Sequence, residues 1–325
     1  MRVSSSPAAS TLTIINQFVN RATENDAFLV GNGLRSCTTE IQVSPQFLVD
    51  DRPVILIDTP GFNDTVMDDA DVLKSISAFL AMVSATSTST FDTTDPRSRY
   101  EHEVNLAGVI YFHRISDERW RRSDTRSFGW LKRICGEPTL RNVVLATNMW
   151  GNVDPGIGAD RERQLAAEFV KPALDKGAQL HRHYDTTESA HQIIRAILDN
   201  RREPLQVQRE LIDERREFDQ TTVGEEITRE VDESKRKLER EIAELRNALE
   251  TARGKEKETR MQLEAEIAEL RETIRKLNDG SKNMNADYIV KKKKTDKRFS
   301  FLWIAVGIGI LSLLFGVLRF GVLLL

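Results

Sequence analysis

The chain has 325 residues, 30% of them charged, and a formal net charge of −3 at pH 7, which gives no global reason to expect nucleic acid as a partner. This length holds one full α/β domain and leaves roughly a hundred residues for other elements. The 2 cysteines, Cys37 and Cys135, are too few for a disulfide framework and lack metal-ligand spacing, which indicates a reducing compartment.

The N-terminal part predicts a tail, one helix and a pair of short strands. Residues 1–9 are a Ser-, Pro- and Ala-containing tail without the long apolar core of a signal peptide. A helix is expected over residues 10–20, where apolar side chains recur on one side. Residues 41–43 and 47–49 predict an antiparallel pair that precedes the central strand.

The central strand is expected over residues 53–57, because five consecutive apolar or β-branched positions suit a strand covered on both faces. Asp58 follows where an α/β sheet presents its ligands, and a carboxylate there would hold Mg²⁺ through water. Gly61 would offer its backbone N–H to a γ-phosphate. A strand followed by a Pro-Gly turn, with no ligand, is the alternative interpretation.

Helices and strands alternate after this point. Helices are predicted over residues 69–83, 125–135 and 161–171 and around Ile193, Ile194 and Ile197, and strands over residues 106–112, 143–146 and 179–184. Residues 84–95 are dominated by Ser and Thr and predict a solvated loop. This alternation indicates an α/β fold.

Three motifs in order resemble those of G-domain proteins. They are Leu-Arg-Ser-Cys-Thr-Thr-Glu-Ile at residues 34–41, Asp-Thr-Pro-Gly-Phe-Asn-Asp-Thr at 58–65 and Asn-Val-Val-Leu-Ala-Thr-Asn-Met-Trp at 142–150. They resemble switch I, switch II and the base-recognition strand. Over about residues 10–200 the chain is similar to fungal GTPase-like proteins related to septins and to the GIMAP/Toc GTPases. The resemblance implies a three-layer P-loop NTPase fold that takes GTP with Mg²⁺.

The resemblance also implies roles for residues of the two switches. Thr38 matches the switch I threonine, whose hydroxyl binds Mg²⁺ and whose amide meets the γ-phosphate. The adjacent Thr39 is an open alternative for this role. Asp58 would serve the metal, and Gly61 would sense the γ-phosphate. An ordinary pair of β-branched residues entering a strand is the competing interpretation of the two threonines.

The family's phosphate-binding loop, Gly-x-x-x-x-Gly-Lys-Ser/Thr, and the strand before it are missing from this sequence. Matching residues 14–16 to the family's Phe-Ile-Asn puts Thr13 at the Mg²⁺-binding hydroxyl and Thr11 at the lysine position. An alternative alignment on Ser10 and Thr11 leaves Ala9 at the lysine position. A shortened but working GTPase and a degenerate G domain that no longer hydrolyses nucleotide are both consistent with this loss.

The base-recognition strand departs from the family pattern Asn/Thr-Lys-x-Asp. Asn148 stands for the lysine and Trp150 for the aspartate, which leaves guanine versus adenine open. Trp150 would stack on a base and Asn148 would hydrogen-bond its edge. The expected nucleotide-binding residues are Thr13, Thr38, Asp58, Gly61, Thr147, Asn148 and Trp150, and Thr13, Thr38 and Asp58 of these serve the metal. No catalytic residue is assigned.

A coiled coil is expected over residues 225–280, after a linker helix over residues 204–224. Apolar residues recur there at steps of three and four, and residues 238–246 repeat as residues 263–271. The shift of the repeat gives about 3.57 residues per turn, which is typical of a weakly left-handed coil. We expect a homodimer through this coil, because a lone charged helix would leave the leucine seam in water.

The C-terminal part predicts a membrane anchor. Residues 281–298 form a basic juxtamembrane segment, and residues 299–318 are long and apolar enough for one transmembrane helix, with a tail to residue 325. The positive-inside rule then places the N-terminal domain in the cytosol and makes the lipid bilayer a partner.

The sequence therefore predicts three parts: a truncated G-like domain over residues 10–203, the coiled coil, and a single-pass C-terminal anchor. The expected fold class is a three-layer P-loop NTPase sheet, incomplete at its N-terminus, followed by the coil and the transmembrane helix. The expected function is a membrane-anchored GTPase-like protein that binds GTP and switches with it. The alternative is a non-enzymatic coiled-coil adaptor with a degenerate G domain. No nucleophile-and-base motif supports a hydrolase of another type.

Overall fold

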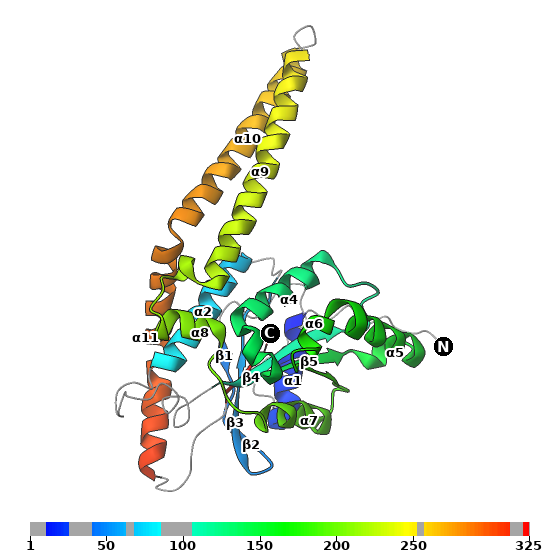
Figure 1. Cartoon of the computed structure of the whole chain (residues 1–325), viewed down its shortest axis with the longest axis vertical. Helices are drawn as coiled ribbons and strands as arrows, with labels where there is room; N and C mark the ends of the chain where they lie inside the picture. The colour runs from blue at the N-terminus through cyan, green and yellow to red at the C-terminus, as the bar shows by residue number, and fades with distance from the viewer. Residues whose placement is uncertain are drawn as a thin grey trace. The chain divides into compact units, whose positions relative to one another are not determined.

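A computed structural model of the chain describes residues 11–25, 41–62, 68–85, 106–251, 257–312 and 321–324. The chain divides into two compact units (Figure 1). The first comprises residues 1–215 and 292–325, and the second comprises residues 216–291. Each unit has its own fold.

The first unit contains a sheet with the strand order β1-β3-β7-β4-β5-β6, and β2 also pairs with β3. The strands are β1 (Gln42–Val43), β2 (Phe47–Val49), β3 (Arg52–Asp58), β4 (Leu106–Arg114), β5 (Val143–Asn148), β6 (Gln179–Arg182) and β7 (Gly321–Leu324). β1 and β2 run antiparallel to β3, while the remaining neighbours are parallel. The last described strand of the chain therefore lies in the middle of the sheet.

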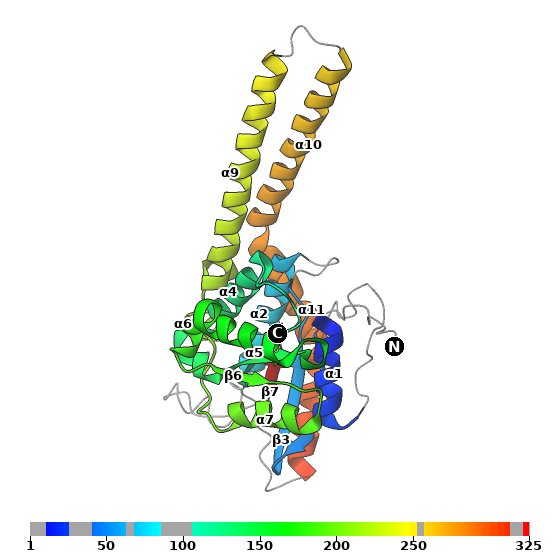
Figure 2. The same ribbon diagram turned by 90° about the vertical axis from the view of Figure 1, so that its right-hand side faces the viewer.

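Helices pack on both faces of this sheet (Figure 2). The longer ones are α1 (Thr11–Thr23), α2 (Asp69–Ala85), α4 (Arg122–Cys135), α5 (Pro155–Gln164) and α7 (Thr187–Leu198). Shorter elements are η2 (Glu137–Asn142), η3 (Trp150–Asn152), η4 (Leu165–Phe169), α6 (Lys171–Leu174), α8 (Gln206–Gln208) and η5 (Arg209–Asp213). Phe112 of β4 contacts Phe18 of α1, whereas its neighbour Tyr111 contacts Phe128 of α4, so the two rings mark opposite faces.

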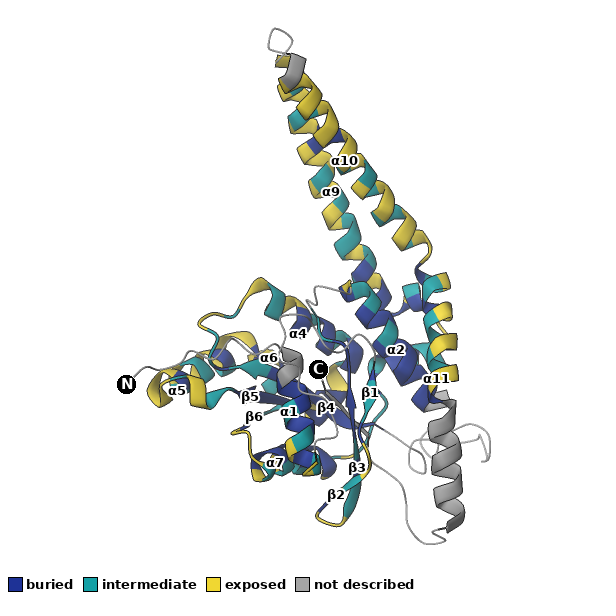
Figure 3. Cartoon of the chain, turned by 180° about the vertical axis from the view of Figure 1, so that it is seen from behind, coloured by how far each residue is buried: buried dark blue, intermediate teal, exposed yellow. Residues whose placement is uncertain are grey.

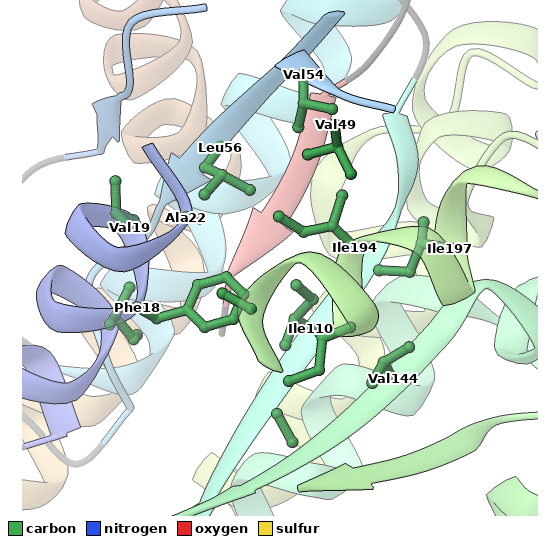
Figure 4. Close-up of a cluster of buried hydrophobic side chains, with 14 of the residues drawn as sticks. Phe18, Val19, Ala22, Val49, Val54, Leu56, Ile110, Val144, Ile194 and Ile197 are labelled. Carbon is green, nitrogen blue, oxygen red and sulfur yellow. The ribbon is translucent and has the colours of Figure 1, made fainter. Parts of the chain in front are cut away.

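The main core cluster lies between the sheet and helices α1 and α7 (Figure 4). It contains Ile15, Phe18 and Val19 of α1, Val54 and Leu56 of β3, Ile110 of β4, Val144 of β5, and Ile193, Ile194 and Ile197 of α7. The apolar residues of both helices recur at helical spacing and form one stripe each. Thr186 caps α7 by accepting a hydrogen bond from the backbone N–H of Ser189 at 3.2 Å.

Most predicted elements of this unit are confirmed, with two departures. The expected strand pair over residues 41–43 and 47–49 does not form, because β1 and β2 each pair with the longer β3 instead. The helix expected over residues 161–171 is interrupted, since α5 passes into the π-turn η4 before α6 begins. Pro172 has no backbone N–H, which favours a new helical start there.

The second unit is a helical hairpin. It contains η6 (Phe218–Gln220), α9 (Thr222–Thr251), α10 (Lys257–Lys282) and the start of α11 (Met284–Ser312). Helices α9 and α10 lie side by side in both views (Figures 1 and 2). The seam expected to form one continuous coil over residues 225–280 thus folds back on itself, and Ile242 of α9 and Ile267 of α10 are both buried. Figure 3 shows that most other positions of the hairpin are exposed or half-buried.

The base of the hairpin is closed by aromatic stacking and a tight backbone contact. Phe218 stacks on Tyr288 of α11, with ring centroids 4.7 Å apart. Thr221 accepts a hydrogen bond from the backbone N–H of Gly224 at 3.1 Å and begins α9. A Cβ on Gly224 would lie 2.0 Å from the carbonyl oxygen of Phe218, so only glycine allows this approach.

The expected transmembrane helix is wrong. Within the part of the chain that the structure describes, no helix is long and apolar enough to cross a membrane. The last residues, Gly321–Leu324, pair within the sheet instead. The predicted single-pass anchor and membrane localisation are corrected accordingly.

The expected fold class is corrected with it. Most described residues are helical, and the strands of the sheet are short. The P-loop NTPase sheet with a coil and a transmembrane helix therefore does not describe this chain. The position in the sheet that was expected to be empty is filled by β7, which comes from the opposite end of the sequence.

Candidate functional site

Two predicted site residues lie at the same edge of the sheet, where the parallel strands end. Asp58 is the last residue of β3 and Asn148 is the last residue of β5, and their exposed fractions are 0% and 3%. The order β3-β7-β4-β5 separates them laterally by three strand spacings, which is about 14 Å. The register aligns Asp58 with Val144, so Asn148 also lies four residues, about 13 Å, further along the strands. In open parallel sheets this carboxyl edge is where ligands bind.

The amide of Asn148 is the most informative group at this edge. Both Nδ2 and Oδ1 are buried, and neither has a hydrogen-bond partner among the described residues. A buried amide without partners costs about 1–3 kcal/mol, so native structures satisfy such groups in nearly all cases. An amide that no described residue satisfies points to a ligand or ordered water as its partner.

His183 lies beside Asn148 and adds a second polar atom without a partner. Its backbone N–H donates to the carbonyl of Thr147 at 2.7 Å, which places it just beyond the end of β6. Its Nδ1 lies 2.9 Å from Ser189 Oγ, while Nε2 is buried without a partner. Ser189 Oγ also contacts the carbonyl of Thr186 at 2.9 Å and accepts from the backbone N–H of Tyr184 at 3.1 Å, so the tautomer of His183 decides whether Nε2 donates or accepts.

Burial keeps this imidazole neutral. Burial beneath Phe18, whose ring centroid is 5.1 Å away, lowers the pKa of His183 from 6.5 to about 4, against the opposing charge of Asp185. Arg21 lowers the pKa further, and it also forms an ion pair with Asp185 at 3.1 Å. At neutral pH the edge therefore presents an uncharged amide and an uncharged imidazole.

We expect a pH-dependent stability from His183. The unfolded chain takes up a proton below pH 6.5 that the folded chain takes up only near pH 4, so the free energy of unfolding falls as pH decreases across this window. The loss is about 3 kcal/mol at its full extent. Urea unfolding at several pH values between 7 and 4.5 gives the free energy of unfolding. This free energy should fall less steeply with decreasing pH in His183→Gln than in the wild type. Burial also lowers the pKa of His113 and His181, which leaves a residual slope. Equal slopes in both proteins would contradict the burial argument.

Thr147 and Trp150 are engaged in holding the strand end together. The indole Nε1 of Trp150 donates to the carbonyl of Thr147 at 3.1 Å and to its hydroxyl at 3.2 Å. The guanidinium of Arg182 lies over the Trp150 ring at 4.2 Å and is itself held by Glu162. One face of the indole is therefore covered by Arg182, which limits the expected stacking on a base to the remaining surface.

The other predicted site residues are placed only in part. Thr13 lies in α1, where its side chain is outside the description, and Thr38 lies outside the described residues. Gly61 follows β3, and a Cβ there would meet no atom within 4 Å. Among the described residues no group of three or more His, Cys, Asp or Glu could hold a metal ion.

The sequence analysis did not include His183 among the site residues. It predicted a strand over residues 179–184, whereas β6 ends at Arg182 and His183 stands beyond it, next to Asn148. One signal in the sequence could have found His183. The predicted strands β5 and β6 are parallel neighbours, so the residues at their C-terminal ends lie at the same edge of the sheet.

No protein-family model matches the chain, and no curated protein matches it significantly. The resemblance to G-domain proteins stays a prediction that rests on the three motifs.

Proposed function

We propose that the first unit binds a guanine nucleotide along the carboxyl edge of the sheet. The observation that carries this proposal is the buried amide of Asn148, which has no partner on either atom. An amide of this kind pairs with a purine edge by donating one hydrogen bond and accepting another. Asp58, three strands across and four residues back in register, would serve Mg²⁺ at the phosphate end.

The neighbouring His183 supplies a second polar atom for the base. In the tautomer whose Nε2 accepts, it would suit guanine, which offers two adjacent donors at N1 and N2, whereas adenine offers only its amino group. Asn148 and His183 together would thus accept two hydrogen bonds and donate one. This pairing replaces the carboxylate that the family places at the position of Trp150.

Affinity for the phosphates should be low. The sequence has no Gly-x-x-x-x-Gly-Lys-Ser/Thr loop, whose charge-assisted contacts are worth about 1.5–3 kcal/mol each. The interaction with the base therefore supplies a large share of the binding free energy. Hydrolysis requires a group to orient the attacking water, and no described residue is assigned to that role.

Calorimetric titration of the full chain with GTP, GDP and ATP, each with and without Mg²⁺, tests this function. We expect weak binding of GTP and GDP, weaker binding of ATP, and a gain in GTP affinity with Mg²⁺. Absence of binding at millimolar concentration, or a preference for ATP, would overturn the proposal.

The hairpin supports a second candidate function, an adaptor that associates through its coil. Pairing of α9 with α10 leaves Leu245, Leu249 and Leu270 only half-buried. A second hairpin would cover the same stripe and complete a four-helix arrangement. The homodimer predicted from the sequence remains a prediction, now as a pair of hairpins.

We expect the full chain to sediment as a dimer at tens of micromolar. Leu245→Glu combined with Leu270→Glu should shift it to the monomer, because two charges would enter the apolar interface. Glu244→Gln with Glu269→Gln, at exposed neighbouring positions, is the matched control. A monomeric wild-type chain would remove the adaptor candidate in this form.

A further inference from the structure

The sheet of the first unit is joined in the middle by β7, a strand of 4 residues. On one side of β7 lie β1, β2 and β3, and on the other lie β4, β5 and β6. β7 is the single described strand that pairs with both sides, through Ile55–Asp58 of β3 and Leu106–Ile110 of β4. Without it the sheet would consist of two separate halves.

The spacing between β3 and β4 suits one extended segment. The two strands are consecutive in the described chain, yet they are separated by two strand spacings, which is about 10 Å. Both contribute side chains to the core cluster with α1 and α7, so their separation is set by packing on the sheet face (Figure 4). Their facing edges carry backbone N–H and C=O groups that require a partner when buried.

The pairing of β7 is short and irregular. It has 4 residues, while β3 has 7 and β4 has 9. Its register with β4 shifts between Leu106 and Gly108, so the backbone pairing there is not continuous. A strand of this length contributes few hydrogen bonds to each neighbour.

Helix α11, which precedes β7 in the chain, also packs on the first unit. Phe299 of α11 is buried and packs edge-on against Phe79 of α2, with centroids 5.2 Å apart. Helix α2 is the described part of the connection from β3 to β4. The contact therefore holds α11 next to α2, which belongs to the connection between β3 and β4.

We propose that the gap between β3 and β4 is a peptide-binding site for an extended apolar segment in parallel pairing, and that Gly321–Leu324 of the same chain is its resident, exchangeable ligand. Backbone pairing to both strands provides the affinity, as in recognition by strand addition. The direction is set by the parallel register, in which Leu324 lies beside Asp58. This inference is independent of nucleotide binding, and its failure would leave the proposed function untouched.

Disulfide cross-linking of the full chain tests the register and the source of the strand. In a background of Cys37→Ser and Cys135→Ala, the pair Ile57→Cys and Leu323→Cys should form an intrachain bond on oxidation, because these positions are register partners. The control pair Ile57→Cys and Val322→Cys faces opposite sides of the sheet and should cross-link about tenfold less. Equal cross-linking of both pairs, none in either, or a cross-linked dimer would overturn the proposal.

Peptide exchange tests the site itself. Leu323→Pro removes a backbone donor from a central strand and should vacate the gap. A labelled peptide of residues 318–325 should then bind the full-length variant at least about tenfold more tightly than the wild type, where the resident segment competes at high effective concentration. The same peptide carrying proline at position 323 should not bind. Equal binding of the two peptides to the variant, or tighter binding to the wild type, would overturn the proposal.

Discussion

Gly108→Ala is expected to destabilise the first unit by about 3 kcal/mol, because an added Cβ would have no room. At this position in β4 the Cβ would lie 2.2 Å from the carbonyl oxygen of Asn142 and 2.6 Å from Cγ2 of Ile197. The first neighbour is backbone, and the side chain of Asn142 is tied to the carbonyl of Arg201 at 2.8 Å. The strand must therefore move away from η2 and α7.

Thermal unfolding followed by circular dichroism measures this effect, which corresponds to a decrease of roughly 10 °C in Tm. Gly129→Ala in α4 is the matched control, because a Cβ there meets no atom within 4 Å. Alanine within a helix is favoured over glycine by about 0.5–1 kcal/mol, so the control should be neutral or stabilising. A Gly108→Ala protein as stable as the wild type would show that β4 does not approach η2 this closely.

Asn148→Leu is expected to change stability and ligand binding in opposite directions. Leucine has a similar shape and removes an amide that is buried without partners, so the variant should gain about 1–3 kcal/mol in the free energy of unfolding. The same change should lower the affinity for guanine nucleotides by about tenfold or more, since a lost hydrogen-bonding edge costs at least about 1.4 kcal/mol. Urea unfolding and calorimetric titration measure the two effects.

Asn142→Leu separates a functional amide from a structural one. Asn142 is buried to a similar extent, at 2% exposure against 3% for Asn148. Its Nδ2 donates to the carbonyl of Arg201, so its replacement should destabilise the chain and leave nucleotide affinity unchanged. If Asn148→Leu also destabilises the chain, the amide of Asn148 has a structural role and the candidate site loses its main support.

The position of the site was predictable to the extent that it depends on local pattern. The apolar run before Asp58 and the run before Asn148 each predicted a strand that ends at a polar residue, and both strands are confirmed. Parallel strands bring such ends to one edge, which is why two distant residues share a site. The environment of His183 was not predictable, because its burial depends on α1 and on Ser189 of α7.

The C-terminal part shows where the same local rules fail. Residues 299–318 have the hydropathy of a membrane span. Hydropathy depends on composition alone, so it does not distinguish an apolar segment buried in lipid from one buried against protein. In the structure the side chain of Phe299 is buried and packs against Phe79 within the protein.

The sequence by itself determined the local elements: the strands before Asp58 and Asn148, the stripes of α1 and α7, and the apolar seam of residues 225–280. These depend on periodicity within a few turns or residues, which sterics and burial impose locally. Only the tertiary structure decided that the seam closes within one chain and that Gly321–Leu324 occupies the middle of the sheet. Both outcomes pair segments distant in sequence. The seam packs through apolar side chains that suit a partner from the same or another chain, and β7 pairs through backbone groups common to nearly all residues, so local periodicity does not identify either partner.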